Sequence, residues 1–272
     1  MFAKMNHIAM ISENYARASK FYESVFGMKT SAKARPARAT TVGDGYVGLN
    51  INPRYAGRPG RLDHFGIQVA DTETAFERMR QKYPKLEWVK RPGNRPFAGI
   101  TAHDMDGNVF DISQSSMENR RDMYEENAGV GDIYISHFAL RTMNPDAAAE
   151  FYSTVFELQP CAKKEGDRNH YLTDGHVTMV LMPWRITDYI GTGIVGPSME
   201  HIGFTVKNMA EFQANAEKVF GENPLLAPLS LGTGAEGLRR LELVRDSCPL
   251  YQHHMTDADG ILLSVTEAGS KK

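Results

Sequence analysis

Three residues in the first half of the chain, His7, His64 and Asp111, could together hold a divalent metal ion. Each stands in a short apolar run of the kind that forms a β-strand. Alternate side chains of a strand share one face, so three such strands side by side could present all three groups together. Two imidazoles and one carboxylate on one face of an octahedron leave three positions open for a bidentate substrate and O2 or water.

The recurrence of the histidines is more informative than any one of them. A single histidine at the start of a strand is most often a packed core or surface residue. This chain has a histidine at the start of four similar segments, at positions 7, 64, 137 and 201. Because histidine is costly to bury without a partner, this recurrence indicates common descent, either with retained function or without it.

The segments around these histidines belong to an internal repeat. Residues 6–28 and 136–158 share an early histidine and an F-Y-x-x-V-F block. The H-x-G motif recurs in D-H-F-G-I-Q-V and E-H-I-G-F-T-V, and the sequences D-M-D-G-N-V-F-D-I-S-Q and D-A-D-G-I-L-L-S-V-T-E close the two halves. Three blocks in the same order with growing offsets indicate duplication with loop insertions. Each half also repeats within itself, which predicts four similar units.

Each unit is predicted to contain a strand, a helix and then two or three strands. The helices are expected to begin after side chains that suit an N-cap, at positions 14, 71, 144 and 208. Glycine-containing turns predict hairpins within residues 40–51 and 171–182. Residues 183–198 and 221–237 are rich in glycine and proline and are predicted to be loops.

Comparison of the halves predicts one complete site. Asp111 lies four residues after Gly107, whereas Ser264 lies four residues after Gly260. A serine hydroxyl supplies no negative charge, so the second set is predicted to be degenerate; it comprises His137, His201 and Ser264. A weaker hypothesis gives that set a third ligand from Glu242, His254 or Glu267. The odd spacing from Ser264 to Glu267 places Glu267 on the opposite face unless a bulge intervenes.

The blocks together resemble the vicinal oxygen chelate superfamily, which includes glyoxalase I, fosfomycin-resistance proteins, bleomycin-binding proteins and type I extradiol dioxygenases. The resemblance covers nearly the whole chain, and four units in one chain are most similar to the extradiol dioxygenases. It implies an α+β fold of two tandem domains. Each domain would pair two βαβββ modules in an open, U-shaped mixed sheet around a metal and ligand cup.

Carried over to this sequence, the family's metal ligands fall on His7, His64 and Asp111. The family usually has glutamate as its third ligand, and its four-unit dioxygenases usually hold the metal in the C-terminal half. The resemblance also suggests domain boundaries. We expect an N-terminal domain at 1–116 (modules 1–58 and 59–116), a linker at 117–132, and a C-terminal domain at 133–272 (modules 133–197 and 198–272).

Further residues are candidates for the surroundings of the metal. His103 is the nearby candidate for proton transfer. The candidates for substrate binding are Asn50, Arg35, Arg54, Tyr46 and Phe97. The planar fork of arginine suits carboxylates and phosphates, although loop arginines are most often solvated and aromatic residues most often belong to the core or its rim. Gln114 could hydrogen-bond a metal ligand.

Composition limits the class of protein. With 31 basic and 33 acidic residues, the net charge of −2 gives no sign of a nucleic-acid partner. No run approaches the ~20 apolar residues that a membrane span needs, and the N-terminal residues do not read as a secretory signal. The two cysteines form no C-x-x-C motif, which suits a reducing compartment. A cytoplasmic protein is expected.

The leading functional hypothesis is a dioxygenase that binds a catechol-like or other vicinal-oxygen small molecule and uses O2. One divalent metal per chain is expected, with Fe(II) favoured and Mn, Zn, Ni or Co as alternatives. A metal-dependent isomerase, epimerase or lyase of glyoxalase type is the second hypothesis. The third is a non-enzymatic small-molecule-binding resistance protein. The second half is expected to have a structural role, either completing the pseudo-symmetric fold or forming an oligomer interface. A homo-oligomer is expected.

Overall fold

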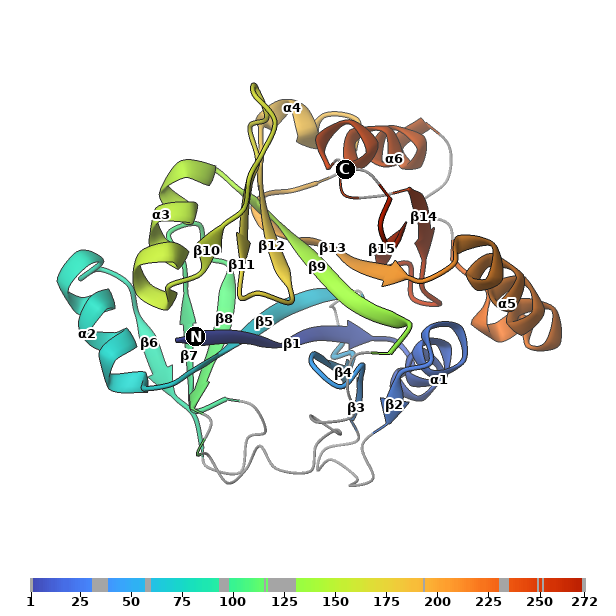
Figure 1. Ribbon diagram of the computed structural model, residues 1–272, viewed down its shortest axis with the longest axis horizontal. Coiled ribbons are helices and arrows are strands. Elements are labelled where there is room, and N and C mark those ends of the chain that lie inside the picture. Colours follow the sequence, from blue (N-terminus) through green and yellow to red (C-terminus); the bar gives the residue numbers. More distant parts are fainter. Residues whose placement is uncertain are drawn as a thin grey trace.

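The structure is a computed structural model, and it contains two open mixed sheets flanked by helices (Figure 1). It describes residues 2–30, 39–56, 60–92, 98–114, 116, 131–192, 194–229, 235–248, 250 and 252–270. The greater part of the expected linker, residues 117–130, lies outside the described residues.

The described residues of the first half form one sheet and two helices. Its elements are β1 (Ala3–Ser12), α1 (Tyr15–Phe26), β2 (Lys29–Thr30), β3 (Thr40–Gly43), β4 (Gly48–Pro53), β5 (Arg61–Val69), α2 (Thr72–Lys82), β6 (Trp88–Lys90), β7 (Ile100–His103) and β8 (Val109–Gln114).

The second half repeats this order with additions. Its elements are β9 (Ile133–Thr142), α3 (Pro145–Phe156), β10 (Gln159–Pro160), β11 (His170–Thr173), β12 (Thr178–Pro183), α4 (Ile186–Tyr189), β13 (Ser198–Val206), α5 (Met209–Glu222), the 3-10 helix η2 (Pro224–Leu226), α6 (Ala235–Ser247), β14 (His253–Thr256) and β15 (Leu262–Glu267).

The topology of the two sheets confirms the predicted fold class. The strand order is β2-β3-β4-β1-β5-β8-β7-β6 in the first sheet and β10-β11-β12-β9-β13-β15-β14 in the second. At the centre of each sheet, the first strands of two units pair antiparallel, as β1 with β5 and β9 with β13. Parallel partners flank each central pair. Each sheet therefore joins two units of the repeat.

Four of the predicted helix starts are confirmed by capping hydrogen bonds. The side chains that accept a bond from the backbone N–H three residues on are those of Asn14, Asp71, Asn144 and Asn208. These side chains satisfy amide groups that the first helical turn leaves without partners.

The predicted loops at 183–198 and 221–237 were wrong in part. The first contains α4, and the second contains η2 and the start of α6. Helix α6 buries Gly237 and Val244 along its length while Leu238 is exposed. A helix with so narrow an apolar stripe gives a weak periodic signal in the sequence.

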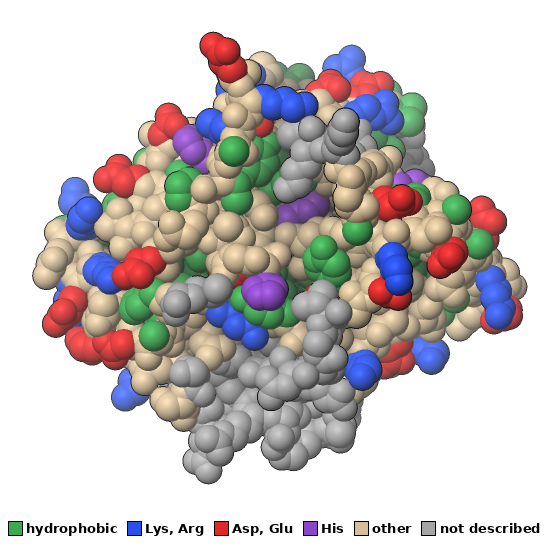
Figure 2. Space-filling model, viewed as in Figure 1, with side chains coloured by type: hydrophobic (Ala, Val, Ile, Leu, Met, Phe, Trp, Pro, Cys, Tyr) green, Lys and Arg blue, Asp and Glu red, His purple; other side chains and the backbone are tan. Residues whose placement is uncertain are grey.

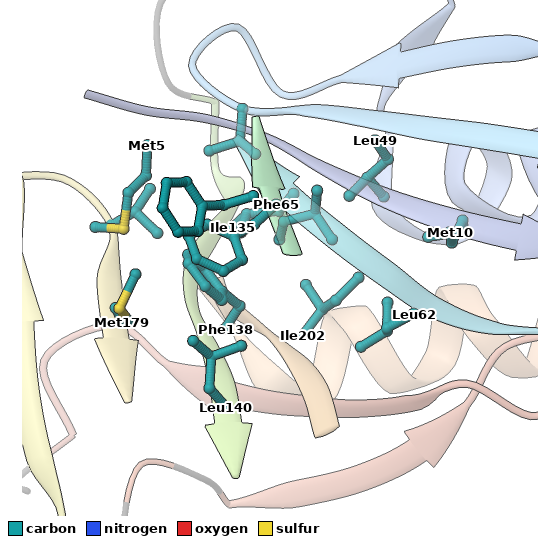
Figure 3. Close-up of a cluster of buried hydrophobic side chains, with 14 of the residues drawn as sticks. Met5, Met10, Leu49, Leu62, Phe65, Ile135, Phe138, Leu140, Met179 and Ile202 are labelled. Carbon is teal, nitrogen blue, oxygen red and sulfur yellow. The ribbon is translucent and has the colours of Figure 1, made fainter. Parts of the chain in front are cut away.

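The hydrophobic core lies between the two sheets. The ring centroids of Phe65 on β5 and Phe138 on β9 are 5.1 Å apart, and Leu62, Leu140 and Ile202 extend the same cluster (Figure 3). Phe65 follows His64 and Phe138 follows His137. Since adjacent strand residues point to opposite faces, the histidine-bearing faces of the two sheets point away from each other.

Matching contacts join the two halves. The buried Tyr22 hydroxyl donates to Asp257 Oδ2 at 3.0 Å, and the buried Tyr152 hydroxyl donates to Asp104 Oδ2 at 2.9 Å. Helix α1 packs near α5, and α2 packs near α3, on opposite flanks of the molecule (Figure 1). Each half thus donates a tyrosine to a turn of the other half. Burial raises the pKa of Asp257 to about 6 and also raises the pKa of Asp104.

The described surface agrees with the small net charge. On the face shown in Figure 2, acidic and basic side chains are interspersed around the rim. Among the described residues, no helix combines the length and the apolar content required to cross a membrane.

The paired tyrosines generate a prediction about stability. Tyr22→Phe or Tyr152→Phe removes a donor from a buried carboxylate, which should lower the free energy of unfolding by about 1–3 kcal/mol in each case. Urea titration followed by circular dichroism measures the change. Tyr55→Phe, at a side chain that is 66% exposed, should stay within about 0.5 kcal/mol of the parent. Unchanged urea midpoints for both tyrosine variants would show that these two hydrogen bonds contribute nothing to the free energy of unfolding.

Candidate metal centre

The three predicted ligands of the first half lie on neighbouring strands and share one face. His7 is on β1, His64 on β5 and Asp111 on β8. Gly66 of β5 is in register with His7 on one side and with Asp111 on the other. His64 is two residues from Gly66, so its side chain points to the same face.

Their ligand atoms converge. Asp111 Oδ2 lies 3.3 Å from His64 Nε2 and 3.8 Å from His7 Nε2. The two imidazole rings are nearly perpendicular, with centroids 5.6 Å apart, and all three ligand atoms lie within 4.8 Å of one another. Ligands bound to one ion at about 2.1 Å are separated by about 3.0–3.4 Å. The residues therefore fit a single divalent metal after small side-chain movements.

A β-bulge precedes each of these histidines. Met5 pairs with Ile67 and His7 with Gly66, so Asn6 is an extra residue in β1. In the same way, Asp63 is left between the pairs that Leu62 and His64 form with β1. A bulge re-aims side chains.

The bulged residues hold the two imidazole rings. Asn6 Oδ1 lies 3.0 Å from His7 Nδ1, and Asp63 Oδ2 lies 2.9 Å from His64 Nδ1. A proton on each Nδ1 would make these hydrogen bonds and leave the Nε2 lone pair for a metal. Neither acceptor was predicted from the sequence. The polar residue before each histidine, in an otherwise apolar strand, is a pattern that could have indicated them.

The carboxylate is held from the neighbouring strand. Thr101 of β7 is in register with Asp111 and donates its hydroxyl to Asp111 Oδ1, which leaves Oδ2 facing the histidines. Burial raises the pKa of Asp111, but hydrogen bonding and charge from His64 outweigh it and lower that pKa. Burial likewise lowers the pKa of His64, but Asp111 and Asp63 overcome it and raise the value to about 9.

Gly66 makes room for the first imidazole. A Cβ atom at this position would lie 1.9 Å from His7 Cε1, so any other residue would displace the ring. Gly203 has the same relation to His137, also at 1.9 Å. The H-x-G motif thus carries a candidate ligand histidine and a glycine that leaves space for the imidazole of the neighbouring strand.

The predicted substrate-binding residues are distributed differently. Asn50 of β4 is in register with Ala9, so its side chain lies on the ligand face, where its Oδ1 accepts from Thr41 Oγ1 at 3.0 Å. Arg54 is exposed and pairs with Glu13 at 2.8 Å. Arg35 and Phe97 lie outside the described residues.

The structure does not bring Tyr46 to the metal ligands. Tyr46 lies in the turn between β3 and β4, which meets the second half of the chain. Its ring stacks on His176 with centroids 4.3 Å apart, and its hydroxyl donates to Asp174 at 3.1 Å. A packing role between the halves accounts for this aromatic residue.

Gln114 and His103 lie near the ends of their strands. Gln114 Oε1 accepts from the backbone N–H and the hydroxyl of Thr72, both at 3.1 Å, and so holds the start of α2. The structure corrects the expectation that Gln114 contacts a metal ligand. His103 lies two residues from Thr101, and its ring contacts the Asp104 carbonyl oxygen at 2.7 Å and the Glu87 N–H at 3.4 Å.

The second half reproduces the histidine positions. Gly203 is in register with His137 and with Ser264, and His201 is two residues from Gly203. Of the alternative third ligands, Glu242 is exposed and Glu267 accepts from the backbone N–H of Met209. His254 is in register with Ser264. The third group that converges with the two histidines is Cys248, which was not predicted.

Comparison with known proteins supports a single fold family. The family model described as Glyoxalase/Bleomycin resistance protein/Dioxygenase superfamily matches residues 4–112 and 134–226. The metallothiol transferase FosB of Lysinibacillus sphaericus (strain C3-41) is 23% identical over 126 residues, which cover 45% of this chain and 89% of that protein.

Solved structures show the same architecture along the chain. The Mn(II)-bound glyoxalase from Novosphingobium aromaticivorans is 12% identical, with a TM-score of 0.65 over 98% of this chain and 82% of that one. The 2,3-dioxygenase LapB from Pseudomonas sp. KL28 is 12% identical, with a TM-score of 0.62 over 98% of this chain and 92% of that one. Such low identities show the fold alone.

Gly66 offers a test of the centre. In Gly66→Ala the new methyl group must push the His7 ring aside, so divalent-metal affinity in the first half should fall at least about 10–100-fold. Calorimetric titration of the metal-free protein measures this change. Gly221→Ala on α5 is the matched control, because a Cβ there meets nothing within 4 Å. Equal affinities for both variants, with native circular dichroism, would contradict the assigned position of His7.

Proposed function

Because the chain belongs to the Glyoxalase/Bleomycin resistance protein/Dioxygenase superfamily, we propose that its first half is the active site of a metal-dependent dioxygenase. Its substrate would be a catechol-like or other small molecule with two vicinal oxygens, and O2 would be the second substrate. The observation that carries the proposal is the convergence of His7, His64 and Asp111 on one face of the sheet.

Fe(II) is the favoured metal for this ligand set. Two imidazoles and one carboxylate on one face are typical of non-haem Fe(II) oxygenases, and Mn, Zn, Ni or Co would fit the same ligands. When bound, the metal would lower the pKa of the substrate oxygens and hold O2 beside the ring. Two neutral imidazoles and one carboxylate leave one net positive charge on a divalent ion, which favours an anionic substrate oxygen.

The candidate metal site is partly exposed to solvent. The side chains of His64 and Asp111 are 20% and 11% exposed, whereas that of His7 is fully buried. Solvent therefore reaches the ligands from the side of β5 and β8. A substrate could approach from this side while the buried His7 ring stays held between Asn6 and Gly66.

Other residues of the chain are assigned supporting roles. Asn6 and Asp63 keep both Nε2 atoms directed inward, and Thr101 orients the Asp111 carboxylate. The Asn50 amide, held by Thr41, is assigned to substrate orientation. Proton transfer is assigned to His103, whose ring would have to leave its present contacts with Asp104 and Glu87 to reach a substrate.

An oxygen-uptake assay tests the reaction. The metal-free protein is loaded with Fe(II) without air, catechol and substituted catechols are added, and O2 consumption is followed with an electrode. Iron-dependent uptake is expected in the parent, and Asp111→Asn should reduce it at least about 100-fold, because the anionic ligand is lost. Glu222→Gln is the matched amide control at an exposed carboxylate, and it should retain full uptake.

The alternative functions predict different outcomes in this and related measurements. Turnover of a vicinal-oxygen substrate that continues without O2 would indicate the isomerase, epimerase or lyase chemistry instead. Ligand binding and metal content that Asp111→Ala leaves unchanged would indicate a binding protein with no metal role for this residue. An iron-loaded protein that consumes no O2 with any catechol would overturn the dioxygenase proposal.

A further inference from the structure

We propose that the second half binds a metal ion of its own, Zn(II), through His137, His201 and Cys248, and that this ion stabilises the fold. The three ligand atoms lie within 4.8 Å of one another, and all three residues are buried. The proposal concerns a centre separate from the one in the first half. Zinc binding at this second centre does not depend on the proposed dioxygenase reaction in the first half.

The two imidazoles of the second half are arranged like those of the first. Their rings are nearly perpendicular, with centroids 5.3 Å apart. Here too the preceding residue is bulged: Ser136 and Glu200 are each left between two paired positions. Ser136 Oγ lies 3.3 Å from His137 Nδ1, and Glu200 Oε2 lies 3.1 Å from His201 Nδ1. Both Nε2 atoms are therefore directed inward.

Cys248 supplies the third group from a different direction. It directly follows α6, and its Sγ lies 3.7 Å from His201 Nε2. A tetrahedral zinc ion with Zn–N of about 2.1 Å and Zn–S of about 2.3 Å separates these atoms by about 3.6 Å. Ser264 Oγ lies 3.4 Å from His137 Nε2, so the serine faces the same space without contributing charge.

The thiolate restores the charge that Ser264 does not supply. A cysteine binds metal as the thiolate, with one negative charge. Two imidazoles and a thiolate around a divalent ion then give the same net charge as two imidazoles and a carboxylate. Sulfur in place of oxygen shifts the preference toward softer ions, for which Zn(II) is the common choice with Cys and His ligands.

The surroundings of this second centre indicate a structural role. Cys248 packs in a buried cluster with Ala139, Tyr171, Val180 and Met182. Cys248, His201 and Ser264 are each 0% exposed, and His137 is 3% exposed. The partly exposed ligands of the first half contrast with this closed environment. A fourth position remains for water or for His254, which is in register with Ser264.

Cobalt substitution tests the proposal. The protein, made without a histidine tag and kept reduced, is stripped with a chelator and titrated with Co(II), and the near-ultraviolet thiolate-to-cobalt band is recorded. Asp111→Asn is used as the background, so that the second centre is measured alone. One equivalent of Co(II) should produce the band, and Zn(II) should displace it. Adding Cys248→Ser should abolish the band and weaken binding at least about 100-fold.

The other cysteine provides the matched control. Cys161 is half-buried and packs against the same apolar cluster, so Cys161→Ser should keep both the band and the affinity. A band that survives Cys248→Ser, or a folded Asp111→Asn protein that binds neither ion, would overturn the proposal. X-ray absorption of Zn-loaded Asp111→Asn protein gives a test without changing Cys248. One sulfur neighbour of zinc is expected, and nitrogen and oxygen neighbours alone would contradict it.

Discussion

Both candidate metal centres depend on one kind of interaction, the hydrogen bond between each of their histidines and the residue before it. Adjacent side chains of a regular strand point to opposite faces and cannot make this contact. The chain inserts one extra residue at four places, and the four are Asn6, Asp63, Ser136 and Glu200. Each bulge interrupts the strand ladder and places an acceptor beside Nδ1. The opposite ring nitrogen is thereby directed toward the other candidate ligands.

The sequence was sufficient for the fold because its strongest signals are local or repeated. N-caps such as Asn144 act within one helical turn, and duplicated blocks indicate which strands are equivalent. The ligand face followed from strand periodicity once Asp111 and Ser264 were aligned. The bulges could not be derived in the same way, because an extra residue is defined by pairing with another strand.

The remaining misses have separate physical causes. The role predicted for Gln114 overlooked strand periodicity. Gln114 is three residues from Asp111, and this odd spacing predicts that the two side chains lie on opposite faces of the strand. The same reasoning correctly separated Glu267 from Ser264. Tyr46 contacts the other half of the chain, 128 residues away from its partner Asp174, and no local pattern reports so distant a contact. Cys248 follows α6, a helix that has a weak apolar pattern and no counterpart among the described residues of the first half.

The reciprocal contacts of Tyr22 and Tyr152 describe a body with approximate twofold symmetry inside a single chain. In a dimer of identical subunits, one codon specifies the same residue at both symmetry-related sites, so a substitution alters both together. Here each site has its own codon, and aspartate can occupy position 111 while serine occupies position 264. In the roles proposed for the two sites, covalent fusion would let one site remain open for reaction chemistry while its twin changes its ligands and closes.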